Sequence, residues 1–172
     1  MKVPHSTVDG VASEARERAA AWGRRGFLFA VLLILIAGLL GYLGMKKGTV
    51  SATGGGYQLH LTYPRIARAG LDVPWELTIT HPGGFDGPVV VEVTGAYFDI
   101  FESQGISPEP SDETSDGDWD RMTFAQPVGD TLTIDLDIYV QPASQIGRGG
   151  TARVLDHGSP AASLDFHTWL LP

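Results

Sequence analysis

The sequence predicts an all-β domain preceded by a single membrane-spanning α-helix. The first observation is an apolar run without a single charged residue, from Phe27 to Met45. The second is the alternation of apolar and polar residues from Tyr57 onward, which is typical of half-buried strands. The third is that no stretch of ten residues after Tyr57 has the spacing of an amphipathic helix. We therefore expect a transmembrane helix at 27–45 and an antiparallel β-sandwich at 57–172.

The predicted membrane helix would extend about 28 Å, close to the thickness of about 30 Å of a hydrocarbon core. Positive charge flanks it on both sides, with more before it than after it. Four arginines precede the run and two lysines follow it: Arg16, Arg18, Arg24, Arg25, Lys46 and Lys47. This excess places residues 1–26 in the cytoplasm as a short stub and the C-terminal part outside. We predict a single-pass protein of the cell membrane with an extracytoplasmic C-terminal domain.

An alternative interpretation is an export signal that is removed. Arg24-Arg25-Gly26-Phe27-Leu28 resembles a twin-arginine signal, and Val50-Ser51-Ala52 offers small residues for cleavage. The apolar run is longer than the stretch of about 7–15 residues found in most signal peptides, which favours an uncleaved anchor. Both interpretations place the C-terminal domain outside the membrane.

The segments around the predicted helix have their own patterns. Residues 7–22 have apolar residues at helical spacing, so the stub is either a helix on the membrane surface or an unstructured basic tail. Residues 46–56 are small, polar and glycine-rich, which predicts a flexible linker. Small residues recur along the predicted helix at spacings that would let a second helix approach closely: Ala37, Gly41, Gly44 and Gly48.

Eight strands are predicted in the C-terminal part, and turn residues such as Pro82-Gly83-Gly84 separate them. The predicted ranges are 57–63, 74–80, 89–93, 96–101, 119–124, 131–140, 151–156 and 161–170. In 131–140 the alternation is clearest, because every second residue is a large aliphatic one: Leu132, Ile134, Leu136, Ile138 and Val140. Short antiparallel strands in a domain of about 115 residues predict an Ig-like β-sandwich.

Part of this domain resembles the Ig-like modules of bacterial cell-surface proteins, the CARDB type and its relatives. The similar segments are Val73–Thr80, Pro82-Gly83-Gly84, Val89–Thr94 and Val128–Ile134. The resemblance spans residues 70–142 and implies a surface interaction or spacer domain. It implies no catalytic residues.

An acidic segment at 109–120 is the candidate metal site. Asp112, Asp116, Asp118 and Asp120 can be laid over ligand positions of an EF-hand-like loop, and Ca²⁺ prefers such oxygen ligands. Position 12 of that loop would be Thr123 instead of glutamate, so a solvated acidic loop is the alternative. No other cofactor is predicted.

Charge and composition exclude several functions. Residues 1–48 carry a net charge of +4 and residues 49–172 a net charge of −12, so no nucleic-acid partner is expected for the C-terminal domain. The absence of cysteine excludes disulfides, thiolate metal sites and thiol nucleophiles. No catalytic motif is present and the five histidines have no metal-site spacing, so we predict that the protein is not an enzyme. The expected function is an interaction or accessory domain whose partners are the lipid bilayer and a membrane or envelope protein.

Overall fold

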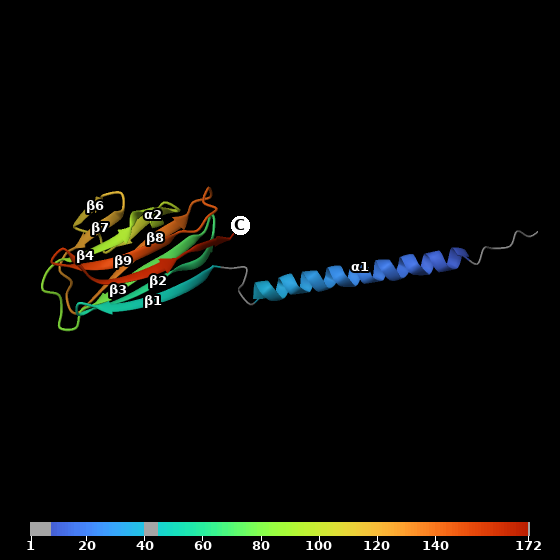
Figure 1. The fold of residues 1–172 in the computed structure, drawn as a ribbon, viewed down its shortest axis with the longest axis horizontal. Helices are drawn as coiled ribbons and strands as arrows, with labels where there is room; N and C mark the ends of the chain where they lie inside the picture. Colours follow the sequence, from blue (N-terminus) through green and yellow to red (C-terminus); the bar gives the residue numbers. More distant parts are fainter. Residues whose placement is uncertain (1–7, 40–44, 172) are drawn as a thin grey trace, which may run out of the picture. The chain divides into compact units, whose positions relative to one another are not determined.

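The computed structural model describes residues 8–39 and 45–171 (Figure 1). The chain divides into two compact units, the first ending at Leu43 and the second beginning at Gly44. The first contains one helix and the second contains the strands. The coarse prediction is confirmed: the described protein consists of mostly antiparallel β-sheets and one apolar helix near the N-terminus.

Helix α1 (Val8–Leu39) is continuous and about 48 Å long at 1.5 Å per residue. It includes residues 8–22, so this part of the stub is helical and is not an unstructured tail. That it lies on the membrane surface stays a prediction. Its segment Glu17–Leu39 has a mean hydropathy of 1.7 and is long and apolar enough to cross a membrane. A signal sequence meets the same criteria of length and composition.

The second unit contains eleven described strands in two sheets. The bounds are β1 (Lys46–Gly54), β2 (Tyr57–Arg68), β3 (Asp72–Thr80), β4 (Val89–Thr94), β5 (Phe101–Ser107), β6 (Asp112–Ser115), β7 (Trp119–Phe124), β8 (Thr131–Val140), β9 (Gly149–Asp156), β10 (Ser159–His167) and β11 (Trp169–Leu171). One sheet has the order β1-β2-β3-β8-β5, and β11 pairs in parallel with the C-terminal end of β2. The other has the order β10-β9-β4-β7-β6.

The two sheets contribute to one hydrophobic core, as the alternation in the sequence predicts. On β3, Trp75, Leu77 and Ile79 are buried, and the five aliphatic residues predicted to share a face of β8 are buried as well. The core combines them with residues of the other sheet such as Val91 and Phe166. Strand pairing is therefore stabilised by apolar burial on the shared inner faces.

The predicted linker at 46–56 is wrong, because most of it forms strand β1. The segment has few large apolar residues, so its sequence does not show the alternation typical of a strand. The strand is stabilised by pairing with β2 and by the packing of Val50 and Ala52 against the core. Gly54 pairs with Tyr57, which leaves Gly55 and Gly56 as a two-residue turn. Both have positive φ, of 54° and 85°, as a type I′ hairpin requires.

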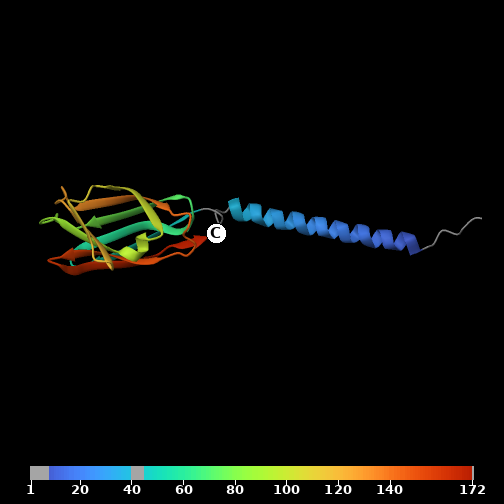
Figure 2. The ribbon, with the colours of Figure 1, turned by 90° about the horizontal axis from the view of Figure 1, so that it is seen from above.

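The predicted strand at 96–101 is also wrong. Gly95–Phe98 forms α2, a single helical turn among the strands (Figure 2), and β5 begins only at Phe101. The aromatic residues explain the turn, because Tyr97 is fully buried and its ring lies 4.6 Å from that of Phe166. The buried residues of this segment, Tyr97, Ile100 and Phe101, have the i, i+3, i+4 spacing of a helical turn.

Candidate functional site

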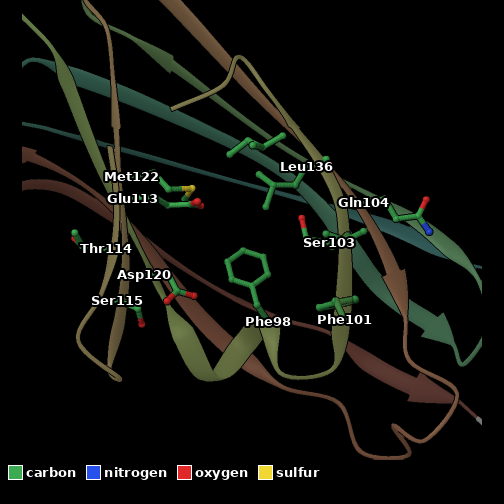
Figure 3. Close-up of a pocket in the computed structure, with 13 residues that line it drawn as sticks. Phe98, Phe101, Ser103, Gln104, Glu113, Thr114, Ser115, Asp120, Met122 and Leu136 are labelled. Atoms are coloured by element: carbon green, nitrogen blue, oxygen red, sulfur yellow. The ribbon is translucent and has the colours of Figure 1, made fainter. Parts of the chain in front are cut away.

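A cleft of about 660 Å³ lies between the ends of the two sheets, where β5 and β6 are the terminal strands (Figure 3). Strands β5, β6, β7 and β8 and helix α2 supply its walls. The lining residues are Phe98, Phe101, Ser103, Gln104, Gly105, Ile106, Glu113, Thr114, Ser115, Asp120, Met122, Leu136 and Ile138. Concave sites with an apolar base and a few polar groups are the usual form of a binding site.

The base of the cleft is apolar and is fixed by the core. Figure 3 shows Phe98 projecting from α2 between β5 and the β6–β7 pair, with Met122 facing it from β7. Behind Phe98 the Trp75 ring makes an edge contact, with 5.9 Å between ring centroids. Tyr97 anchors α2 through a hydrogen bond of 2.9 Å between its hydroxyl and Thr168 Oγ1. Burial raises the pKa of the Tyr97 hydroxyl, so it stays a neutral phenol.

The rim of the cleft is polar and acidic on the side of the second sheet. Glu113 and Asp120 lie there on adjacent strands, with Ser115 directly paired to Asp120. On the β5 side the rim is uncharged and consists of Ser103 and Gln104. A ligand in the cleft therefore meets carboxylates along one wall only.

The charge of the second unit is concentrated in the strands that build this cleft. Residues 99–140 contain eleven acidic residues and one basic residue, a net charge of −10, whereas all other residues of 49–172 have a net charge of −2. The single basic residue, Arg121, is paired with Glu92. Such a field attracts cationic groups and repels anionic ones.

The acidic segment predicted as a calcium loop is a β-hairpin. Asp112 lies on β6 and Asp120 on β7, and Asp116 and Asp118 lie in the turn between them. Oδ1 of Asp116 accepts backbone N–H bonds from Trp119 at 2.8 Å and from Asp118 at 3.1 Å. The Trp119 bond is the main reason why the pKa of Asp116 lies below its usual range.

The predicted EF-hand-like loop conformation is therefore wrong, because the cross-strand pairing of β6 with β7 separates Asp112 from Asp120. Within residues 17–39 and 45–171, no three His, Asp or Glu side chains are grouped to hold a metal ion. Calcium binding stays a prediction.

The predicted small-residue stripe does not continue along one helix. Ala37 lies in α1, whereas Gly48 lies in β1, where an added Cβ would be 3.0 Å from the Tyr63 ring. Gly41 and Gly44 lie outside the described residues. The assignment of Gly48 to helix packing was wrong, because this glycine lets β1 fit beside the Tyr63 ring.

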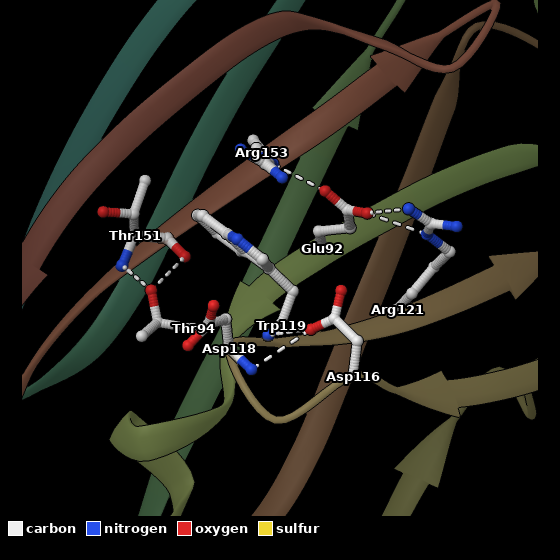
Figure 4. Close-up of polar contacts among 8 residues, drawn as sticks. All are labelled: Glu92, Thr94, Asp116, Asp118, Trp119, Arg121, Thr151 and Arg153. Atoms are coloured by element: carbon white, nitrogen blue, oxygen red, sulfur yellow. Dashed lines mark hydrogen bonds and ion pairs between the residues drawn. The ribbon is translucent and has the colours of Figure 1, made fainter.

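Sequence reasoning missed a buried ionic cluster on the second sheet (Figure 4). Glu92 on β4 is only 1% exposed. Its neighbours across the ladder are Arg121 on β7 and Arg153 on β9. Arg121 Nε donates to Oε1 at 2.7 Å, and Arg153 Nε donates to Oε2 at 2.6 Å. The guanidinium carbon of Arg153 also lies over the Trp119 ring, 3.6 Å from its centroid.

The signal for this cluster was a single glutamate inside the apolar strand Val89–Thr94, with one arginine in each of two other predicted strands. Only the register of β4 with β7 and β9 brings the three together. All polar atoms of the Glu92 carboxylate are used within the cluster, so we regard it as structural.

A second hollow, of about 860 Å³, lies where the β1–β2 turn meets the 81–88 segment. His81 is held there by a 2.5 Å bond between its Nδ1 and the Gly84 carbonyl, and its ring lies 4.6 Å from that of Tyr57. Burial is the main cause that raises the pKa of Tyr57. His60 bonds to Ser51 Oγ at 2.8 Å across the β1–β2 ladder. Both histidines thus stabilise strands and turns.

No family model and no curated protein matches the chain. Among solved structures, it is similar to the Pseudomonas fluorescens alkylpurine DNA glycosylase AlkC bound to DNA containing an abasic site analog. The identity is 16% and the TM-score is 0.31, and the match covers 66% of this chain and 30% of that chain.

The prediction that this protein is not an enzyme is contradicted by that match, since the glycosylase is an enzyme, and we do not maintain it. With a TM-score of 0.31, the match supports no further statement about this chain. Neither glycosylase activity nor DNA binding is assigned to it.

Proposed function

We propose that the protein is a membrane-anchored interaction module. In this proposal α1 spans the cell membrane once with its N-terminus in the cytoplasm. The second unit is an extracytoplasmic Ig-like β-sandwich, and its acidic cleft binds a membrane or envelope protein. The observation that carries the proposal is that the chain combines a helix with an exposed apolar surface and a separate β unit with an open cleft.

The apolar side chains of α1 support the anchor. Phe27 is 69% exposed and Leu39 is 87% exposed, and eight further large apolar side chains of the described helix are exposed as well. Burying one such side chain fully is worth about 1.5–3 kcal/mol. Exposure of these ten apolar side chains to water is unfavourable, and insertion of the helix into a bilayer would remove the side chains from water. The arginines that precede the run support the orientation.

The position of β1 favours the anchor over a cleaved signal. The small residues that a signal peptidase would recognise, Val50-Ser51-Ala52, lie within β1, and each is paired with a residue of β2. Cleavage after Ala52 would remove most of a strand that packs against the core. A released domain would thus begin without one edge of its first sheet.

The topology can be tested with the full-length protein in cells. An extracytoplasmic reporter, such as a periplasmic alkaline phosphatase, is expected to be active when fused after Pro172 and inactive when fused after Gly23. The intact mass of the purified protein should include residues 1–52. Activity at Gly23 would contradict the orientation, and a mature chain that begins at Thr53 would contradict the anchor.

The interaction itself can be tested by photo-crosslinking from the cleft. We expect a photoreactive phenylalanine analogue at Ser103, on the cleft rim, to yield a discrete product with a membrane or envelope protein. The same residue at Ser163, exposed on β10 of the other sheet, is the matched control and should yield none. Equal products from both positions, or no product from Ser103, would reject the cleft as the interaction site.

A further inference from the structure

The occupant of the cleft can be deduced from its shape and charge, and this inference rests on the proposed function. We propose that the cleft binds an extended cationic segment of the partner protein, which alternates basic and apolar residues and adds as a strand to β5. Three features of the described residues lead to this occupant.

The first feature is a free strand edge. In the described sheet β5 pairs with β8 on one side, and its other side borders the cleft. An added Cβ at Gly105 would meet no atom within 4 Å, so the cleft beside this strand is open at that point. An extended peptide satisfies such an edge through its own N–H and C=O groups.

The second feature is the apolar base, which Phe98, Met122 and Leu136 form beside β5. Side chains of a strand alternate in direction, so every second residue of a segment paired with β5 would point toward this base. An aliphatic residue at such a position would cover the exposed part of the Phe98 ring.

The third feature is the charge of the opposite wall. Glu113 and Asp120 line the cleft from β6 and β7, and no hydrogen bond or ion pair to a basic side chain of the described residues occupies either carboxylate. Figure 3 shows both carboxylates on the wall that faces β5. With a net charge of −10 over residues 99–140, the site favours lysine and arginine and disfavours acidic segments.

The test uses the full-length protein in nanodiscs of phosphatidylcholine, a zwitterionic lipid that does not attract cationic peptides. The probe is a fluorescent, end-capped heptapeptide of alternating lysine and valine, and its binding is followed by anisotropy. A peptide with glutamate in place of lysine tests the charge. A lysine–valine peptide with N-methylated backbone nitrogens tests the strand pairing. We expect saturable binding of the first peptide and at least ten-fold weaker binding of the other two.

Two double variants locate the site. Glu113→Gln with Asp120→Asn should raise the Kd of the lysine–valine peptide at least five-fold. Glu76→Gln with Asp86→Asn removes the same charge at two positions outside both the cleft and residues 99–140 and should change the Kd less than two-fold. Thermal unfolding verifies that all variants are folded.

Absence of saturable binding, or an equal loss in both double variants, overturns the inference. If the N-methylated peptide binds as tightly as the unmodified lysine–valine peptide, the proposed pairing of the segment with β5 is overturned. Crosslinking from Ser103 assumes nothing about the charge of the partner. A crosslinked product without peptide binding would therefore reject the cationic segment and leave the proposed function intact.

Discussion

Replacing Glu92 with alanine is expected to lower the free energy of unfolding of the β unit by about 3 kcal/mol. The change leaves Arg121 and Arg153 on either side of β4 without their shared carboxylate. Removing one partner of a buried ion pair costs about 3–5 kcal/mol. The lower end applies because the two arginine side chains are 50% and 25% exposed and can be partly hydrated. Urea unfolding of the full-length protein in detergent, followed by tryptophan fluorescence, measures the change.

Two further variants make the result specific. Glu76→Gln removes a glutamate from a strand of the other sheet and should change the free energy of unfolding by less than about 0.5 kcal/mol. Replacing Glu92, Arg121 and Arg153 together with leucine or methionine should restore much of the lost stability, because no unpaired charge remains. A loss below about 1 kcal/mol in Glu92→Ala would show that the cluster is hydrated and does not hold β4, β7 and β9 together.

Replacing Ile134 with aspartate is expected to abolish the native fold of the β unit. Ile134 is fully buried in the centre of β8. An unpaired carboxylate there costs several kcal/mol, in addition to the lost apolar contacts, and the stability of a typical domain is only about 5–15 kcal/mol. Circular dichroism and the absence of a cooperative thermal transition would reveal the loss.

The neighbouring residue supplies the control. Asp135 is exposed on the opposite face of the same strand. Asp135→Leu should leave the fold and the cooperative transition intact, because it changes only the outer surface. Similar melting of both variants would mean that the two faces of β8 are interchanged.

The elements that could be predicted are those whose signal lies in neighbouring residues. Alternation along β3 and β8 reveals both the strand and its buried face, because the side chains of a strand point to opposite sides in turn. The uncharged run after Arg25 predicts an apolar helix in the same way. The described part of that helix extends to Leu39 and Met45 is not helical, while residues 40–44 of the predicted span lie outside the described residues.

Elements stabilised by distant partners were missed. Strand β1 has few large apolar residues, and its pairing with β2 compensates for this. Within 95–101, Tyr97 and Phe101 fit both a strand and a helical turn by spacing, and the packing of Tyr97 against Phe166 stabilises the turn. Local propensity is overridden by tertiary packing in both cases.

Local patterns are sufficient to predict an apolar helix of membrane-spanning length, followed by an acidic domain of amphipathic strands. The concentration of negative charge in residues 99–140 is likewise evident from the order of the residues. The three-dimensional fold was needed to reveal that Glu92 contacts Arg121 and Arg153, which are 29 and 61 residues away, and that β5 and β6 flank a cleft. These contacts could not be predicted because strand register and sheet order depend on the packing of the whole core, whereas alternation and charge belong to each segment alone.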